Sequence, residues 1–216
     1  MNALSVRNLS LHFGEKQVLR AMEFDVPAGE FFVIIGPNGS GKTTLLRAMA
    51  GLQKIESGTV RIQQKAISDY PRRDLARVMA VVPQNVPFDF PFTVAETVLM
   101  GRSPYLGLLG IERKRDYEIA EQAMEFTDIR HLAGRRLDQL SGGERQRVII
   151  AKAICQEPDI ILLDEPTASL DPAHQINVMD LMQRFRRERN TTIVMVSHDL
   201  NLAAMYGDRL LLLKDG

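Results

Sequence analysis

Hydrophobic and polar residues alternate near the start of the chain. Leu9, Leu11 and Phe13 form one alternating series, and Met22, Phe24 and Val26 form another. A period of two is typical of β-strands with one buried face, and the intervening Gly14-Glu15-Lys16 is typical of a turn. We therefore expect an antiparallel sheet in the N-terminal part of the protein.

Farther along, the apolar positions become continuous instead of alternating. The runs are Phe31 to Ile35, Ile160 to Leu163, Ile193 to Val196 and Leu210 to Leu213. Such runs are typical of strands in a parallel sheet that is covered on both faces. Helical spacing falls between them, with one face of Leu45, Met49 and Leu52 and another of Val178, Leu181, Met182 and Phe185. This alternation predicts an α/β fold with a mostly parallel sheet.

A long segment between the first and second apolar runs, roughly Asn85 to Arg147, has a different pattern. Its face of Ile119, Ala123 and Phe126 has helical spacing, and the remainder contains no comparable strand run. We interpret it as an inserted helical subdomain. Because 216 residues suit one sizeable core, we expect residues 1–216 to form a single domain around it.

Composition and charge narrow the possible classes of function. Lys and Arg number 27, as do Asp and Glu, so no broad positive field would attract nucleic acid. The single cysteine, Cys155, excludes an internal disulfide framework, and its helical spacing from Val148 and Ala151 predicts a small buried residue. No stretch approaches about 20 uninterrupted apolar residues, and no export signal pattern opens the chain. We expect neither a membrane span nor export.

A phosphate-binding motif follows the first apolar run. The pattern G-x-x-x-x-G-K-[ST] is matched by Gly36, Pro37, Asn38, Gly39, Ser40, Gly41, Lys42 and Thr43, and Thr44 comes next. The motif lies between a buried strand and an amphipathic helix, which is the context it requires. Glycines let N–H groups surround the phosphates, Lys42 neutralises the β- and γ-phosphate oxygens, and Thr43 would bind Mg²⁺. The alternative is a Gly-rich turn with a surface lysine, and the motif alone indicates only a nucleotide phosphate.

Two carboxylates end the second apolar run. Asp164 and Glu165 lie at the C-terminal end of a predicted parallel strand, where ligands of open α/β sheets bind. We expect Asp164 to hold the metal through water and Glu165 to accept or polarise the proton of an attacking water. The alternative is that both acids merely end the strand.

A second anion site is predicted by the run Leu140-Ser141-Gly142-Gly143-Glu144-Arg145-Gln146. A serine hydroxyl and glycine N–H groups at a helix N-terminus can bind an anion, although a simple helix cap is the alternative. With the phosphate loop upstream and Asp164-Glu165 downstream, this run resembles the signature of ABC ATPases, and the resemblance covers essentially the whole chain. It implies that two chains pair head to tail, with Ser141, Gly142 and Gly143 binding the γ-phosphate at the partner's Lys42.

The same resemblance assigns roles to other residues. It implies that Gln84 reaches the metal and the water, and that His198 contacts the γ-phosphate and orders Glu165. Asp171, in Ser169-Leu170-Asp171, would meet the partner's nucleotide site, and Phe13 would stack on adenine where the family more often has tyrosine. The alternatives are that Gln84 is a surface glutamine, His198 a structural histidine, Asp171 a helix cap before Pro172 and Phe13 a core phenylalanine. His12, His131 and His174 match nothing in the family and are interpreted as structural.

The stretch after Gln84 belongs, in this family, to the surface that faces the membrane partner. It reads Pro87 to Glu96 and then Gly101 to Tyr105, with Thr93 expected to cap a helix. The combination resembles the ATPases of importers for iron-siderophore, haem or cobalamin, although the phenylalanines could simply pack the helical subdomain. The resemblance implies a homodimer, permease subunits, a solute-binding protein and a place at the cytoplasmic face of the cell membrane. Because family members usually continue beyond Lys214-Asp215-Gly216, we expect a C-terminal segment to be absent.

The leading hypothesis is therefore an ATPase that uses ATP and Mg²⁺ to drive solute import through a permease. A soluble ABC ATPase of DNA repair or translation would favour basic surfaces, coiled coils or tandem units. A small-molecule kinase or GTPase would have no use for the signature or His198 in this order. A transporter for another solute, including an exporter, remains a further alternative.

Overall fold

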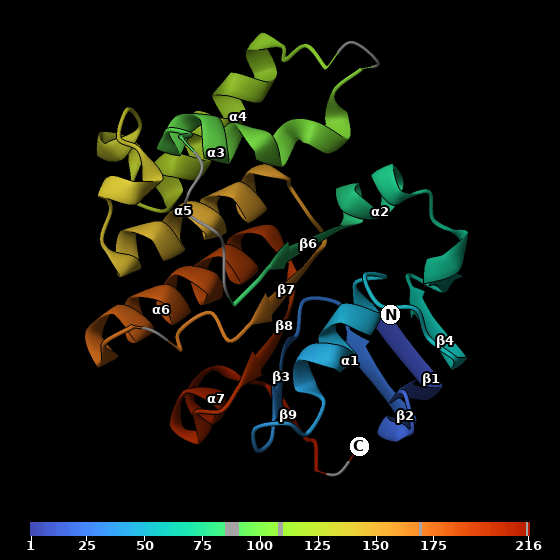
Figure 1. Ribbon diagram of the computed structural model, residues 1–216. Coiled ribbons are helices and arrows are strands. Elements are labelled where there is room, and N and C mark those ends of the chain that lie inside the picture. Colours follow the sequence, from blue (N-terminus) through green and yellow to red (C-terminus); the bar gives the residue numbers. More distant parts are fainter. Residues whose placement is uncertain (85–90, 108–109, 169, 215) are drawn as a thin grey trace.

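The computed structural model describes residues 1–84, 91–107, 110–168, 170–214 and 216, without the side chain of Phe13. Strands in these ranges form two sheets (Figure 1). One is antiparallel with the order β2-β1-β4-β5, and the other is parallel with the order β6-β7-β8-β3-β9. The strands are β1 Asn2–Phe13, β2 Lys16–Pro27, β3 Phe31–Ile35, β4 Ser57–Ile62, β5 Lys65–Ala66, β6 Met79–Val82, β7 Ile160–Asp164, β8 Thr192–Ser197 and β9 Arg209–Leu212. The predicted α/β class and both kinds of sheet are confirmed.

The antiparallel sheet begins with the hairpin that the alternating pattern predicts. β1 and β2 pair antiparallel, with Leu9 opposite Met22 and Leu11 opposite Leu19. Leu9, Leu11 and Leu19 are buried, so the alternation places one face of the hairpin in the core. β4 pairs with the other edge of β1 and widens the sheet.

The parallel sheet has a core on each face, which explains the continuous apolar runs of β3, β7 and β8. The expectation was wrong for the run Leu210 to Leu213, because β9 is an edge strand in which Leu210 and Leu212 are 46% and 66% exposed. In β3, Phe31 and Val33 join the core on one face, whereas Phe32 and Ile34 join the core on the other. Helices α5, Gly142–Cys155, and α6, Pro172–Arg189, contribute to the first core, and α1, Lys42–Met49, contributes to the second together with the antiparallel sheet (Figure 1). A strand covered on both faces needs an apolar residue at every position.

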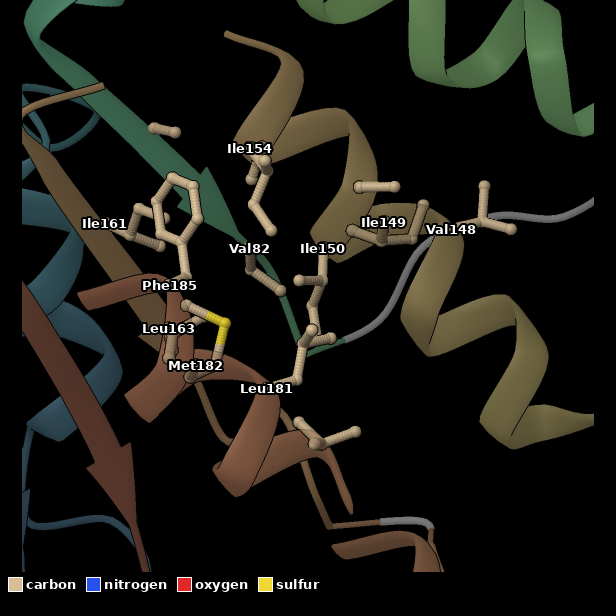
Figure 2. Packing of buried hydrophobic residues seen from close by; sticks show 14 of the residues in the cluster. Val82, Val148, Ile149, Ile150, Ile154, Ile161, Leu163, Leu181, Met182 and Phe185 are labelled. Atoms are coloured by element: carbon tan, nitrogen blue, oxygen red, sulfur yellow. The ribbon is translucent and has the colours of Figure 1, made fainter. Parts of the chain in front are cut away.

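Figure 2 shows the layer between α5, α6 and the parallel sheet. Phe185 and Met182 of α6 lie beside Ile161 and Leu163 of β7, and Val82 of β6 faces α5. The predicted helical face of α6 is confirmed, because Val178, Leu181, Met182 and Phe185 are all buried. The layer fixes the ends of β6 and β7, from which candidate site residues extend.

The remaining helices are η1 Ile67–Asp69, α2 Arg72–Val78, α3 Val94–Leu99, η2 Met100–Tyr105, α4 Lys114–Phe126, η3 Arg130–Leu132, η4 Leu137–Gln139 and α7 Leu200–Tyr206. Among them, α3 and α4 pack against α5, and α7 packs beside α6 on the parallel sheet (Figure 1). Thr93 caps α3 as predicted: its hydroxyl accepts a hydrogen bond from the backbone N–H of Glu96, and the Glu96 carboxylate accepts one from the backbone N–H of Thr93.

The structure differs from the sequence-based expectations at Leu52. This residue lies beyond the end of α1 and is 68% exposed, so it does not extend the buried face of Leu45 and Met49. Gly51, with a φ of 67°, ends the helix in a left-handed turn and redirects the chain. Cys155, in contrast, is fully buried as expected, and burial raises the pKa of its thiol to about 12.

Candidate functional site

The order of the strands brings together, at one edge of the parallel sheet, the residues predicted to act on the nucleotide of their own chain. β6, β7, β8 and β3 are consecutive neighbours, and all run in the same direction. Gln84 follows β6, Asp164 and Glu165 end β7, His198 follows β8, and the loop beginning at Gly36 follows β3. The carboxyl ends of parallel strands meet at one edge, where open α/β sheets bind ligands.

The phosphate loop wraps around the side chain of Lys42. The Lys42 ammonium is buried and donates hydrogen bonds to the carbonyl oxygens of Gly36 at 2.9 Å and Pro37 at 3.1 Å. Gly41 has a φ of 99° where α1 begins, and a Cβ there would lie 3.0 Å from the carbonyl oxygen of Val18. The conformation and the close contact with β2 both favour glycine at this position.

Thr43 and Asp164 meet across the site. The Thr43 hydroxyl donates a hydrogen bond to Oδ1 of Asp164 at 2.9 Å. Burial raises the pKa of the Asp164 carboxyl above its ordinary value, against the opposing effects of the Thr43 hydrogen bond and nearby positive charges. A buried carboxylate and a hydroxyl that converge in this way supply the hard oxygen ligands that Mg²⁺ prefers. The residues present therefore fit a magnesium ion.

The Glu165 carboxylate contacts three of the other predicted site residues. Gln84 Nε2 donates to its Oε2 at 3.0 Å, His198 Nδ1 lies 3.4 Å from the same oxygen, and Lys42 Nζ lies 3.9 Å from Oε1. Its side chain is 14% exposed, compared with 54% for His198. The carboxylate is therefore held on several sides and lies close to Lys42 of the phosphate loop. Such positioning suits a residue that orients or deprotonates water.

The backbone of Glu165 is strained. Its φ is 46°, in the left-handed region that non-glycine residues seldom adopt. Its N–H donates to the carbonyl of Val196 and its own carbonyl accepts from Ala168, which hold the turn in place. Consecutive residues of a strand point to opposite faces, but here Asp164 reaches Thr43 while Glu165 reaches the adjacent Lys42. The turn thus brings both carboxylates to the start of α1, and a strained residue of this kind is characteristic of functional sites.

Two adjoining cavities surround these groups. One of about 710 Å³ has Gly36, Pro37, Asn38, Gln84, Glu165 and His198 among its lining residues. The other, of about 340 Å³, is lined by Lys16, Val18, Asn38, Gly39, Gly41, Lys42, Thr43, Thr44 and Glu165. Lys16 and Val18 are additions that the sequence did not predict. They reach the site because β2 packs against the phosphate loop, a tertiary contact with no local signal.

The signature residues begin α5 with a capping box. Ser141 Oγ accepts a hydrogen bond from the N–H of Glu144 at 3.3 Å, and the Glu144 carboxylate accepts from the N–H of Ser141 at 2.7 Å. Hydrogen bonds to the Glu144 carboxylate from the backbone N–H and then from the side chain of Ser141 hold its pKa below the usual value. Ser141 and Gly142 are exposed, and Gly143 is buried. The helix-cap interpretation is therefore correct. The anion site stays a prediction that is compatible with the cap, because the first N–H groups of a helix have no partner within it.

Asp171 caps α6, which was the predicted alternative to a role at the partner's nucleotide site. Its Oδ1 accepts from the backbone N–H of His174 at 3.0 Å, and the carboxylate is exposed. Ser169 and the side chain of Phe13 are outside the described part, as are residues 85–90. The adenine contact of Phe13 and the loop after Gln84 therefore stay predictions.

Comparison with known proteins identifies the family. A family model described as ABC transporter matches residues 19–168, which include the phosphate loop, the signature and the acidic end of β7. The chain belongs to the ABC transporter family. Within it the chain is the ATP-binding component, an ATPase whose hydrolysis of ATP is coupled to transport.

Similar ABC proteins are named as import ATPases. A probable siderophore transport system ATP-binding protein of Bacillus subtilis is 43% identical over 215 residues, which span 100% of this chain and 78% of that protein. A hemin import ATP-binding protein of Gloeobacter violaceus is 43% identical over 220 residues, which span 99% of this chain and 79% of that protein.

Solved ABC structures have the same fold. A metal-chelate type ABC transporter in an inward-facing conformation superposes with a TM-score of 0.88 and 34% identity, over 99% of this chain and 80% of that one. A dimeric ATP-binding cassette with ADP and phosphate gives a TM-score of 0.84 and 31% identity, over 99% and 95%. Thus an ABC cassette similar to this one forms dimers. In the described ranges of this ABC chain, no helix is long and apolar enough to cross a membrane.

Proposed function

We propose that this ABC ATPase energises import of iron bound to a siderophore, or of haem, as one of two identical subunits beneath a permease. The observation that supports the solute class is the similarity, at 43% identity over nearly the whole chain, to siderophore and hemin import ATPases. In this proposal a solute-binding protein delivers the solute to the permease, and the ATPase acts at the cytoplasmic face of the membrane. Cobalamin, another imported solute and an exported solute are the alternatives.

Within the site, each residue has a proposed role that its contacts support. The phosphate loop and Lys42 would bind the β- and γ-phosphates, and Lys42 would exchange its carbonyl partners for phosphate oxygens. Thr43, Asp164 and the amide oxygen of Gln84 would hold Mg²⁺, which neutralises phosphate charge. Glu165 would polarise the attacking water, and His198 would orient Glu165 and contact the γ-phosphate.

A second copy of the chain would complete the site. Among the residues described, Ser141, Gly142, Gly143 and Asp171 do not line either cavity around the phosphate loop. The exposed helix N-terminus at Ser141 is nevertheless suited to bind phosphate. Head-to-tail pairing would place it over a partner's nucleotide, so that a lone chain binds ATP but hydrolyses it slowly.

A groove near the end of β6 is the proposed permease contact. It measures about 420 Å³ and is lined by, among others, Leu52, Leu75 of α2 and Val81 of β6. Arg73 and Arg77 of α2 both donate to the carbonyl oxygen of Pro104, at 2.8 and 3.0 Å, so α2 is held against η2. The exposed Leu52 beside a groove whose wall is held by hydrogen bonds is the kind of surface that a partner helix covers.

The nucleotide-dependent dimer is tested by light scattering after size exclusion. Glu165→Gln, which keeps the size of the side chain but removes the base, should be monomeric alone and dimeric with Mg-ATP. Ser141→Arg in the same background should bind ATP and remain monomeric, because a bulky cation blocks the partner's phosphate. A Glu165→Gln protein that binds ATP and stays monomeric would contradict the two-chain site.

The solute class is tested by uptake into cells that lack this chain. Restoring the wild type should restore uptake of radioactive iron on a hydroxamate siderophore, or of haemin, and restoring Lys42→Ala should not. Radiolabelled cyanocobalamin is the matched alternative. Rescue of cyanocobalamin uptake alone, or of none of the three, would overturn the proposed solute.

A further inference from the structure

His174, which matches no family motif, lies in the first turn of α6 and contacts Asp171 twice. Its backbone N–H donates to Oδ1 of Asp171 at 3.0 Å, and its ring Nδ1 lies 2.7 Å from Oδ2. These bonds hold the pKa of Asp171 below its ordinary value, so the carboxylate is ionised near neutral pH. An ionised carboxylate only accepts hydrogen bonds, and Nδ1 must therefore carry a proton.

The opposite edge of the same imidazole packs against the signature. A Cβ built on Gly143 would lie 2.6 Å from Cδ2 of His174 and 3.2 Å from Nε2. Real side chains do not approach so closely, so the ring occupies the space that a larger residue would need. A larger residue at position 143 would therefore require the imidazole of His174 to move. One imidazole touches both segments proposed to reach a partner's nucleotide.

The neighbouring Gln175 extends the connection toward Glu165. Its Nε2 donates to the carbonyl oxygens of Thr167 and Leu170, each at 3.1 Å. Thr167 in turn lies two residues after Glu165, and Ala168 donates to the Glu165 carbonyl. The first turn of α6 therefore holds the chain between Glu165 and Asp171 through side-chain bonds.

We propose that His174 is a positioning residue that joins the signature segment, Ser141 to Gly143, to Asp171, so that both approach a partner's nucleotide as one rigid unit. The inference rests on the proposed two-chain site. Helix capping alone does not account for the arrangement, because capping needs only the backbone bond to Asp171 Oδ1. The ring adds the second bond and the contact with Gly143, and together these make a link between the two segments.

The test separates the two halves of this link. His174→Asn keeps a donor near the position of Nδ1 but loses the contact with Gly143. His174→Phe keeps a ring against Gly143 but loses the bond to Asp171. His174→Ala loses both the contact and the bond. If the ring links the segments, breaking either half suffices, and kcat for ATP should fall at least fivefold in all three variants to a similar level. KM and the affinity of the lone chain for ADP should stay within twofold of the wild type, since Lys42 and the phosphate loop are untouched.

His12→Ala is the matched control, because His12 Nδ1 also lies 2.7 Å from a carboxylate oxygen, that of Glu56, and is similarly exposed. It should leave kcat unchanged. Wild-type kcat in His174→Asn or His174→Phe would overturn the inference, as would ADP affinity that falls in parallel with kcat. Failure of the two-chain site would look different from these results. In that case Glu165→Gln would remain monomeric with ATP, even if the wild type hydrolyses ATP.

Discussion

The amide of Gln84 donates to Oε2 of Glu165 at 3.0 Å, which connects the end of β6 with the end of β7. Val81, three residues before Gln84, lines the proposed permease groove, and Glu165 is the proposed water-activating residue. A shift of the end of β6 would therefore change a contact of the carboxylate. We expect this contact to couple the proposed permease surface to ATP hydrolysis.

Replacing Glu165 with Gln should lower the rate of ATP hydrolysis by about 100-fold or more, because the base is lost while the hydrogen-bonding shape remains. Binding of a fluorescent ATP analogue should be unchanged within a few fold. Steady-state phosphate release measures the rate. Glu188→Gln, an exposed change on α6, is the control and should retain the full rate. Normal hydrolysis by Glu165→Gln would show that another group activates the water.

Gly41→Ala should weaken nucleotide binding about tenfold or more. Its φ of 99° is unfavourable for alanine, and the new Cβ would lie 3.0 Å from the Val18 carbonyl oxygen, so the phosphate loop must shift. Titration with a fluorescent nucleotide measures the affinity. Gly134→Ala is the matched control, since a Cβ there meets nothing within 4 Å and no positive φ opposes it. Equal affinities in the two variants would refute the steric argument.

Ser141→Ala and Thr93→Ala remove the same kind of helix cap at different places. Each hydroxyl accepts from the N–H three residues ahead at 3.3 Å, so each loss should cost about 1 kcal/mol of unfolding free energy. Only Ser141→Ala should also lower kcat, because only that hydroxyl is proposed to contact phosphate. Urea unfolding and ATPase assays of the isolated protein compare the two. A similar fall in kcat in both variants would assign the effect to helix capping.

Asp116→Asn should destabilise the protein by about 2 kcal/mol near pH 7, because it removes one of the two carboxylates that pair with the buried Arg102, the one at 3.0 Å, while Glu157 remains at 2.9 Å. Burial alone would raise the pKa of Asp116, but hydrogen bonds from Arg113 and Arg102 outweigh it and the pKa is lowered. An acid with a lowered folded pKa stabilises the fold above its unfolded pKa of about 3.9 and loses that contribution as the pH falls through the folded value.

The difference in unfolding free energy between wild type and Asp116→Asn should therefore be largest at pH 6 to 7 and shrink below about pH 4. Urea unfolding across this range measures it. Asp138→Asn removes an exposed pair with Arg136 and serves as control, with an expected effect of at most about 1 kcal/mol. A difference for Asp116→Asn that does not change with pH would mean that the charge of Asp116 is not the source of stability.

The local sequence predicted much of this protein because its signals are periodic or motif-based. Alternation at Leu9 and Leu11 predicted the hairpin, and the uninterrupted run Phe31 to Ile35 predicted a strand covered on both faces. The phosphate loop was recognisable because phosphate binding needs glycine, lysine and a hydroxyl at fixed spacing in one continuous segment. The order of these motifs was sufficient to indicate the ABC family.

Tertiary structure decided which side chains meet. Only the order β6-β7-β8-β3 places Gln84 and His198 against Glu165, and strand order has no signature in a single segment. Packing likewise brought Val18 to the phosphate loop and His174 to Gly143, and left Leu52 exposed. Contacts between residues far apart in sequence depend on how helices and sheets pack, which is set by the whole core and not by any local pattern.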